Sequence, residues 1–376
     1  MVPQRSRALR VLFVGTFDRD HSRNRTIRGL LERSGHDVRD CRVELWGPVR
    51  YSKLGGDRLA TAWRAAVAYG RLVVRSAVAR RPDVVMMMYP GHLDVLLLAP
   101  IWRLRRVPVV FDPLISLRDT IVVDRQMHGA DSMIGRLSLL VDRWSFRLAN
   151  LVLADTPQVA EHYCELTGIS PRRVAVLWPG ANEAVFTPPV DDAGDACRIL
   201  FYGSFIALHG VETIVRAARL LEDRGVIVRV VGSGQERDAV EAIVDREGIT
   251  NVELVGTVPL EQLPREIRAA GICLGIFGTS AKADRVIPFK VFEYLAMGRP
   301  VVTGDTAAVR AALDGAVVTT PPGDPVALAD ALRDLIDDPQ RRAALARAGH
   351  ERYAAAFDER ALAALLDAEL ARVIGH

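Results

Sequence analysis

Short apolar runs alternate with longer helical patterns along almost the whole chain of 376 residues. Most runs are continuously apolar, and Arg10, Arg229 and Glu253 are the charged residues within them. This predicts strands buried on both faces of their sheet. Strands of this kind separated by helices form a parallel sheet that helices cover on both sides. The runs are residues 9–14, 84–89, 107–111, 151–154 and 174–177 in the first half, and 199–202, 227–231, 252–255, 272–276, 301–303 and 317–319 in the second.

Helical patterns fill the gaps between these runs, and they cover residues 25–34, 58–80, 135–149, 211–224, 236–247, 260–269, 289–297 and 325–336. The stretch 187–195, TPPVDDAGD, is rich in Pro, Asp and Gly and indicates a linker. We therefore predict an α/β fold of two doubly wound, Rossmann-like domains facing a central cleft, comprising residues 1–188 and 189–357. A last amphipathic helix, about residues 358–376, is expected to pack back on the first domain. Such sheets bind ligands at the carboxyl ends of their strands.

The composition excludes several classes of protein. Hydrophobic residues make up 49% and charged residues 25%, as in ordinary soluble domains. Four cysteines lie far apart without a C-x-x-C pair, so we expect neither a zinc site nor a disulfide framework; they are Cys41, Cys164, Cys197 and Cys273. The best candidate for a membrane span, Leu93–Leu104, contains Asp94 and Arg103 and is too short, and no export signal is recognised. A cytoplasmic protein is therefore expected.

The charge is distributed unevenly between the two halves. Residues 1–190 carry 28 Lys and Arg against 18 Asp and Glu, whereas the remainder carries 21 against 28. Arg58–Arg81 places arginines among apolar residues at helical spacing, and Ile101–Arg106 adds a tryptophan and three cations. These segments could lie on an anionic surface at the inner face of a membrane; the preferred interpretation is a half-buried helix with a basic outer face. Without an aromatic platform or a known reader motif, nucleic acid is not an expected partner.

One segment of the second half combines helix signals with a lysine and a glutamate. In Pro288–Val302, PFKVFEYLAMGRPVV, Pro288 predicts a helix start, Gly298 a left-handed stop, and PVV the next strand. Lys290 would lie in the first helical turn, where the helix dipole disfavours a cation unless an anion such as phosphate docks there. Glu293 lies three residues further on and could hold a hydroxyl group of the same ligand. The alternative is an ordinary surface Lys–Glu pair.

This segment closely resembles the donor-binding signature of the GT-B glycosyltransferases of family 4, P-x-K-x-x-E-Y/A-x-A-x-G-x-P-V-V. Three further stretches are similar to strand-end loops of that family, namely residues 199–210 (ILFYGSFIALHG), 230–234 (VVGSG) and 254–258 (LVGTV). The resemblance implies that Lys290 contacts the diphosphate of a sugar nucleotide and that Glu293 contacts its ribose. It also implies further donor-site residues: Gly203, Ser204, His209, Gly210 and Gly232 on the phosphate and sugar side, and Gly256 and Val258 beside the base.

The chain departs from the family pattern at two places. The Arg and Lys of the family's glycine-rich loop fall on Ser204 and His209, which removes or weakens two cations. The first Glu of the family's E-x7-E pattern falls on Arg285. Lys282 and Arg285 in the neighbouring loop could restore neutralisation of the diphosphate, because a phosphate depends on where charge is placed more than on its origin.

The first half offers less specific signals. Gly15 ends the first strand and permits close approach of a ligand. The loop that follows carries His21 and Arg23 on the expected acceptor side, with solvated loop charges as the alternative. Asp18-Arg-Asp20 is interpreted as a helix-capping pair rather than a metal site.

Two further side chains are candidates for handling an acceptor hydroxyl. Asp112 follows a predicted strand, in the neighbourhood where family members often have a histidine-containing loop. Its carboxylate could orient or deprotonate the hydroxyl, or could simply cap the loop. His92, after Tyr89-Pro-Gly, is a candidate on a similar argument. Thr156 and Pro157 predict the N-cap and first residue of a helix.

The resemblance implies a glycosyltransferase that moves a sugar from a nucleotide diphosphate-sugar to a hydroxyl acceptor with retention of configuration, without a metal or other cofactor. The acceptor is expected to be lipid-linked, or a cell-surface or secondary-metabolite glycan. Cations and a helix end would stabilise the departing diphosphate. Two alternatives stay open at this point. One is a sugar-nucleotide epimerase, and the other is a non-catalytic relative that binds a ligand or partner, which Ser204 and His209 favour.

Overall fold

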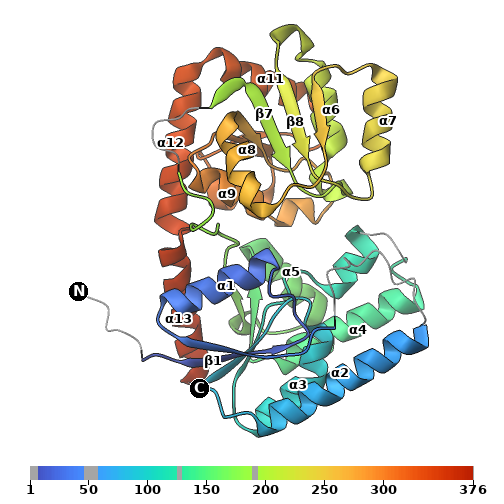
Figure 1. Cartoon of the computed structure of the whole chain (residues 1–376), viewed down its shortest axis with the longest axis vertical. Coiled ribbons are helices and arrows are strands. Elements are labelled where there is room, and N and C mark those ends of the chain that lie inside the picture. The colour runs from blue at the N-terminus through green and yellow to red at the C-terminus, as the bar shows by residue number, and fades with distance from the viewer. Residues whose placement is uncertain (1–6, 46–57, 125–128, 189–193, 376) are drawn as a thin grey trace. The chain divides into compact units, whose positions relative to one another are not determined.

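The computed structural model describes residues 7–45, 58–124, 129–188 and 194–375. The chain divides into two compact units, each with its own sheet (Figure 1). The N-terminal unit comprises Met1–Trp178 and Leu362–His376, and the C-terminal unit comprises Pro179–Ala361. Residues 189–193 of the expected linker lie outside the described residues.

A parallel six-stranded sheet in the order β2-β1-β3-β4-β5-β6 forms the centre of the N-terminal unit. The apolar runs form its strands because helices cover both faces, and all four residues of β3 and of β5 are buried. The elements are β1 (Arg10–Gly15), α1 (Ser22–Arg33), β2 (Asp37–Arg42), α2 (Arg58–Val78), β3 (Val84–Met87), α3 (His92–Leu104), β4 (Val109–Phe111), α4 (Met133–Leu148), β5 (Leu151–Ala154), α5 (Pro157–Thr167), β6 (Val174–Val176) and α13 (Glu359–Ile374).

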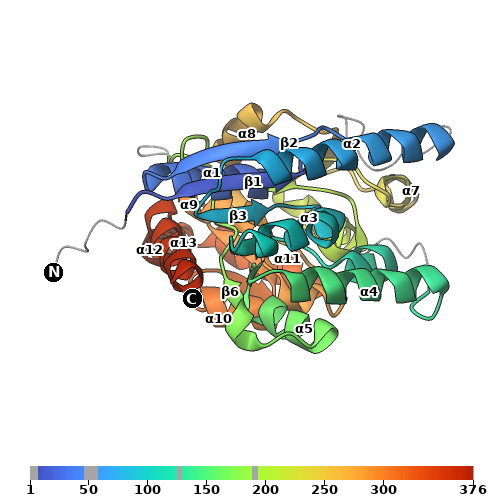
Figure 2. The same cartoon turned by 90° about the horizontal axis from the view of Figure 1, so that it is seen from below.

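The two faces of this sheet are covered by different helices. Ile27 and Leu31 of α1 join Leu362 and Leu366 of α13 in one buried cluster with residues of β1, β3 and β5. The last helix is also held by His36, whose Nε2 lies 2.9 Å from Asp367 Oδ1. Helices α2, α3 and α4 pack in sequence against one another along the sheet (Figure 2).

The C-terminal unit repeats the plan with a second parallel sheet, in the order β12-β11-β10-β7-β8-β9. Its core gathers apolar residues of the central strands and of the flanking helices, among them Phe201, Val230 and Leu274. The elements are β7 (Asp195–Tyr202), α6 (Val211–Arg219), β8 (Ile227–Val231), α7 (Arg237–Glu247), β9 (Val252–Val255), α8 (Leu263–Ala269), β10 (Ala270–Leu274), α9 (Phe289–Ala296), β11 (Val301–Gly304), α10 (Ala307–Leu313), β12 (Val318–Thr320), α11 (Pro325–Asp337) and α12 (Pro339–Ala356).

The predicted fold class of two doubly wound, parallel α/β sheets is confirmed. The prediction missed β2, an edge strand, because four of the six residues in its sequence DVRDCR are charged. The helix start predicted at Thr156 is confirmed, since its side chain accepts a hydrogen bond from Val159 N. Within the described residues, no helix has the length and apolar character needed to cross a bilayer.

Candidate functional site

A buried lysine lies where the central strand of the C-terminal sheet ends. Helix α9 begins at Phe289 with Pro288 as its N-cap, which places Lys290 in the first turn. The Lys290 side chain packs on Phe201 of β7, with Nζ 4.0 Å from the ring centroid. Only 4% of the residue is exposed, and Nζ makes no hydrogen bond within the described part of the chain. Burial lowers the pKa of Lys290 well below its usual range.

Two glycines keep side chains away from this ammonium group. Gly203 follows β7 with φ +152°, and a Cβ there would lie 2.5 Å from Lys290 Nζ. Gly232 follows β8 with φ +141°, and a Cβ there would lie 1.9 Å from the Gly203 carbonyl oxygen. The two strand-end loops therefore pack backbone against backbone beside Lys290, and both positions require glycine.

His209 lies beside Lys290, and both Lys290 and Lys282 are close enough to His209 to act on it electrostatically. His209 is 8% exposed, and its Nδ1 contacts the carbonyl oxygen of Ser204. Ser204 itself is an exposed residue. Burial lowers the pKa of His209 well below its usual range, and the charges of Lys290 and Lys282 lower it further. His209 is therefore neutral at pH 7, and the amino groups gathered here are those of Lys290 and of Lys282, which is 6% exposed.

A third loop joins the site through the start of α6. Gly210 has φ +63° and is the N-cap of α6. A Cβ on Gly210 would lie 2.6 Å from the carbonyl carbon of Phe277, and Phe277 N donates to the His209 carbonyl oxygen at 3.0 Å. The loops after β7, β8 and β10 thus converge on one point at the carboxyl edge of the sheet, as doubly wound folds do at a binding site.

The other predicted donor-site residues lie further out. Glu293 is buried at 7% exposure, one turn along α9 from Lys290. Arg285 is half-buried in the short helical turn Ala283–Arg285, of which Lys282 is the N-cap. Gly256 and Val258 follow β9, the edge strand next to β8; Gly256 is exposed and has no atom within 4 Å of the Cβ position. Their predicted roles beside a base stay predictions.

The sequence reasoning missed Arg237, which supports the glycine loops from behind. Its Nη1 donates to the carbonyl oxygen of Gly232 at 2.7 Å and to that of Val255 at 3.2 Å, so one guanidinium joins the ends of β8 and β9. The same group lies 5.5 Å from the ring centroid of Phe205. No sequence motif predicts this role, because the arginine donates hydrogen bonds to backbone carbonyl oxygens, which every residue has.

In the N-terminal unit, the two residues expected to meet an acceptor form a buried ion pair. Arg23 Nε donates to Asp112 Oδ2 at 2.7 Å, and both side chains are fully buried. Arg23 Nη1 also donates to the carbonyl oxygen of Leu177 at 2.9 Å, and Asp112 Oδ1 accepts from Leu114 N at 3.2 Å. The interpretation of Arg23 as a solvated loop charge is wrong. For Asp112, the geometry favours the loop-capping role over contact with an acceptor hydroxyl.

His92 and Gly15 lie near two further buried carboxylates. His92 is the first residue of α3, is 4% exposed, and has Nε2 3.2 Å from Asp142 Oδ1. Gly15 has φ +136°, and a Cβ there would lie 2.1 Å from Asp94 Oδ2. Asp94 accepts from Thr16 N at 2.8 Å, and burial raises its pKa to about 6. Asp94 was not predicted as a site residue, because the sequence shows it only as an interruption of an apolar stretch.

The loop after β1 is more ordered than its composition suggests. His21 is half-buried with its ring 4.9 Å from that of Tyr89, and burial lowers its pKa. Asp18 Oδ1 accepts from Asp20 N at 2.9 Å, which closes a turn. The interpretation of Asp18 and Asp20 as a helix-capping pair is wrong, because the N-cap of α1 is His21 and no side chain makes a capping hydrogen bond there. Among the described residues, no three His, Cys, Asp or Glu side chains are grouped to hold a metal ion.

The basic segments of the N-terminal unit are only partly available at the surface. Helix α2 exposes Arg71 and Arg75, and the side chain of Arg58 lies outside the described residues. Trp102, expected to face a membrane, is fully buried under Arg105, whose guanidinium lies 4.8 Å from the indole ring. That expectation is wrong, because α3 turns Trp102 toward the core of the unit.

Comparisons with known proteins agree with this architecture. A family model described as "Glycosyl transferase 4-like domain" matches residues 5–180, and one described as "Glycosyl transferases group 1" matches residues 196–338. D-inositol 3-phosphate glycosyltransferase 1 of Catenulispora acidiphila is 30% identical over 305 residues, or 72% of this chain and 70% of that protein. The lipopolysaccharide core biosynthesis glycosyltransferase LpsE of Rhizobium meliloti is 26% identical over 223 residues, or 58% of this chain and 63% of that protein.

Solved structures of low sequence identity share the fold. Sucrose-phosphate synthase from Thermosynechococcus elongatus matches with a TM-score of 0.72 at 18% identity, over 97% of this chain and 99% of that chain. Anabaena HepE in complex with UDP matches with a TM-score of 0.68 at 15% identity, over 96% and 100%. The fold is that of the GT-B glycosyltransferases. Together with the two family models and the Catenulispora relative, it shows that the chain belongs to the glycosyltransferases of the family 4 type.

Proposed function

We propose that this glycosyltransferase takes its sugar from a nucleotide diphosphate-sugar and transfers it to a hydroxyl acceptor with retention of configuration. The observation that carries the proposal is the buried, unpartnered Nζ of Lys290 beside Gly203. A buried ammonium group without a partner costs free energy, and a diphosphate would supply both the opposite charge and the missing hydrogen bonds. The structures of HepE with UDP and with UDP-glucose support a donor of this class.

The proposed chemistry uses groups of the C-terminal unit to stabilise the leaving diphosphate. Lys290 and Lys282 neutralise its growing negative charge, and the first turn of α9 adds its dipole. The acceptor oxygen attacks the anomeric carbon on the face that the diphosphate leaves, the bond from that carbon to the phosphate oxygen breaks, and the acceptor proton passes to the departing phosphate. This route needs no carboxylate base, which fits the engagement of Asp112 with Arg23.

The proposed reaction needs no metal ion, because lysines supply the positive charge. Addition of a chelator is therefore expected to leave turnover unchanged. A loss of activity that manganese restores would revive a metal role for Asp18 and Asp20.

For the acceptor, we propose a lipid-linked or cell-surface glycan reached by an enzyme that lies on an anionic membrane surface through α2 and the exposed residues Arg103, Leu104 and Arg106. The support is the basic character of these segments and the presence of a lipopolysaccharide core glycosyltransferase among the similar proteins. The Catenulispora relative, named for D-inositol 3-phosphate, supports a polyol hydroxyl instead.

The donor and the stereochemistry are tested without knowledge of the acceptor. Purified protein is incubated with UDP-, GDP-, ADP- and dTDP-sugars, and slow hydrolysis is followed by release of the nucleoside diphosphate. Nuclear magnetic resonance then reports the anomer first formed. Release from one donor with the donor's own anomeric configuration is the expected result. An inverted product contradicts retention, and no release from any donor contradicts the proposed donor class.

A further inference from the structure

Helix α4 carries its apolar residues on the side that faces solvent. Four of them recur at a spacing of i, i+4, i+7 and i+11, which places them on one face; Met133, Leu137, Leu140 and Trp144 are between 49% and 83% exposed. The opposite face is the buried one, although most of its residues are small or polar: Gly135, Ser138, Asp142, Ser145 and Phe146. This arrangement reverses the ordinary pattern of a surface helix.

The polar residues inside α4 are satisfied where they lie. Asp142 accepts hydrogen bonds from Leu117 N and Arg118 N, both at 2.9 Å, and thereby holds the loop that follows β4. Ser138 and Ser145 each donate to a carbonyl oxygen of their own helix, at 2.9 and 3.1 Å. Rotation of α4 to bury its apolar stripe would break the bonds of Asp142. The outward stripe is therefore a fixed feature of the fold.

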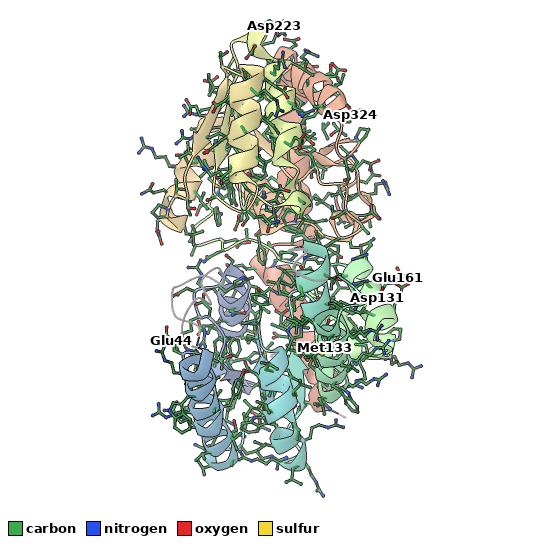
Figure 3. The ribbon with its side chains drawn as sticks, turned by 90° about the vertical axis from the view of Figure 1, so that its right-hand side faces the viewer. Glu44, Asp131, Met133, Glu161, Asp223 and Asp324 are labelled. Atoms are coloured by element: carbon green, nitrogen blue, oxygen red, sulfur yellow. The ribbon has the colours of Figure 1, made fainter. Side chains whose placement is uncertain are left out.

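The two neighbouring helices carry stripes with the same spacing. On α3, Leu93, Leu97 and Leu104 are 47%, 48% and 87% exposed. On α2, Trp63 and Val74 are 72% and 62% exposed. Because α2 packs on α3 and α3 on α4, the three stripes lie on adjacent helices, and Figure 3 shows these helices side by side with Met133 at the start of α4. We call the exposed residues of these helices the three-helix face.

The charges of the three-helix face all have one sign. The exposed charged residues of α2, α3 and α4 among those described are Arg64, Arg71, Arg75, Arg103, Arg136, Arg143 and Arg147. Asp94 and Asp142 are the acidic residues of these helices in the described part of the chain, and both are fully buried. Asp131 is exposed just before α4, but the described parts of the three helices expose no carboxylate. Exposed leucines and tryptophans flanked by arginines are the composition of a surface that enters the headgroup region of an anionic bilayer.

We propose that the three-helix face binds an anionic lipid bilayer, with the α4 stripe inserted among the headgroups and its arginines paired with lipid phosphates. This proposal rests on the membrane association proposed above. It adds α4 to the membrane-binding surface and excludes the buried Trp102 from it. A second copy of the chain is a poorer occupant, because seven exposed arginines on each copy would face one another across a two-fold interface without a compensating carboxylate on these helices.

The test uses the full chain and sedimentation with lipid vesicles, in the absence of donor and acceptor. Vesicles of equal parts phosphatidylcholine and phosphatidylglycerol are compared with vesicles of phosphatidylcholine alone. The stripe variant is Leu137→Gln/Leu140→Gln/Trp144→Gln. Its matched control replaces exposed apolar residues elsewhere, Leu220→Gln/Val326→Gln/Leu365→Gln, which are 39%, 56% and 44% exposed. A second variant, Arg136→Glu/Arg143→Glu/Arg147→Glu, tests the charge.

The wild type and the control are expected to bind the anionic vesicles, and both α4 variants to bind at least about tenfold more weakly. Circular dichroism confirms that the variants fold. Equal binding of the stripe variant, or no binding of the wild type, overturns the proposal. A wild-type dimer in sedimentation velocity that becomes a monomer in the stripe variant also overturns it, in favour of a second copy. None of these outcomes bears on sugar transfer, since no donor is present.

Discussion

Each unit of the molecule buries a cation near the carboxyl edge of its sheet, and the two cations are treated in opposite ways. In the N-terminal unit, Arg23 donates through Nε to Asp112 and through Nη1 to backbone carbonyl oxygens, while its Nη2 makes no hydrogen bond among the described residues. In the C-terminal unit, Lys290 has a phenylalanine ring beneath its ammonium group and no hydrogen-bond partner among the described residues. A buried charge paired with an opposite charge within the chain serves the fold, whereas one without such a partner indicates a ligand of opposite charge.

The largest expected effect is the loss of the internal pair. Asp112→Asn should lower the free energy of unfolding by about 3–5 kcal/mol, because Arg23 stays buried without its counter-charge. Urea denaturation measures the change. The control is Asp83→Asn, which breaks the pair with Arg10, 43% exposed, and should cost no more than about 1 kcal/mol. A similar, small loss in both variants would show that the Arg23–Asp112 pair is not structural.

The second effect concerns a buried carboxylate that has neutral partners. Burial raises the pKa of Asp94 to about 6 from an ordinary value of 3.8. Its contribution to stability is therefore fully present below about pH 4 and is lost as the pH rises through about 6. The free energy of unfolding of Asp94→Asn, taken relative to that of the wild type, should therefore rise by roughly 3 kcal/mol as the pH increases from 4 to 8. Thermal unfolding over this range measures the difference, and parallel curves for the two proteins would refute the shift.

The third effect separates binding from stability at Lys290. Lys290→Met should weaken donor binding about a hundredfold, because a charge-assisted contact with phosphate is lost. The unliganded variant should melt at the wild-type temperature or above, since a desolvated ammonium group is replaced by an apolar side chain. Calorimetric titration and thermal unfolding give the two quantities. The control is Arg246→Met, an exposed cation of the same unit with 65% side-chain exposure, which should change neither.

The smallest effect tests the space beside Lys290. Gly203→Ala should weaken donor binding about tenfold, because the new Cβ would lie 2.5 Å from Lys290 Nζ and displace it. Gly248→Ala is the matched control, since Gly248 also has a positive φ, +62°, but no atom lies within 4 Å of its Cβ position. Both variants should lose roughly 1–3 kcal/mol of stability through backbone strain. Equal donor affinity in the two variants would contradict the assignment of Gly203 to the site.

The comparison also shows which parts of the structure the sequence could predict. The helix start at Pro288, the buried strands and the left-handed Gly298 rest on local rules, and the structure confirms them. The Arg23–Asp112 pair joins residues 89 positions apart, and no local rule anticipates it. The outward orientation of the apolar residues of α4 was not predicted, for another reason. Its apolar periodicity is that of a core-facing helix. The face that turns inward instead carries Asp142, which holds a loop, and Phe146, which packs on Phe111 and Tyr163.

The sequence could predict that Lys290 and the strand-end glycines come together, because they occupy one motif and three strand-end loops. Their role in binding a donor stays a prediction. The role of Arg237 was not predicted, because it acts on backbone carbonyl oxygens of Gly232 and Val255 that carry no sequence signal. The neutral state of His209 was also beyond the sequence, since it depends on burial and on the charges of two lysines brought near it by folding.

The central claim is that Lys290 binds the diphosphate of a nucleotide-sugar, and a thermal-shift screen against UDP-, GDP-, ADP- and dTDP-sugars tests it most directly. A ligand at 100 times its dissociation constant stabilises a protein by about 2.7 kcal/mol, which such a screen detects. The account predicts that one nucleotide family stabilises the wild type and the Arg246→Met control but not Lys290→Met. No change in melting temperature with any of the nucleotide-sugars, or an equal change in Lys290→Met, would contradict it.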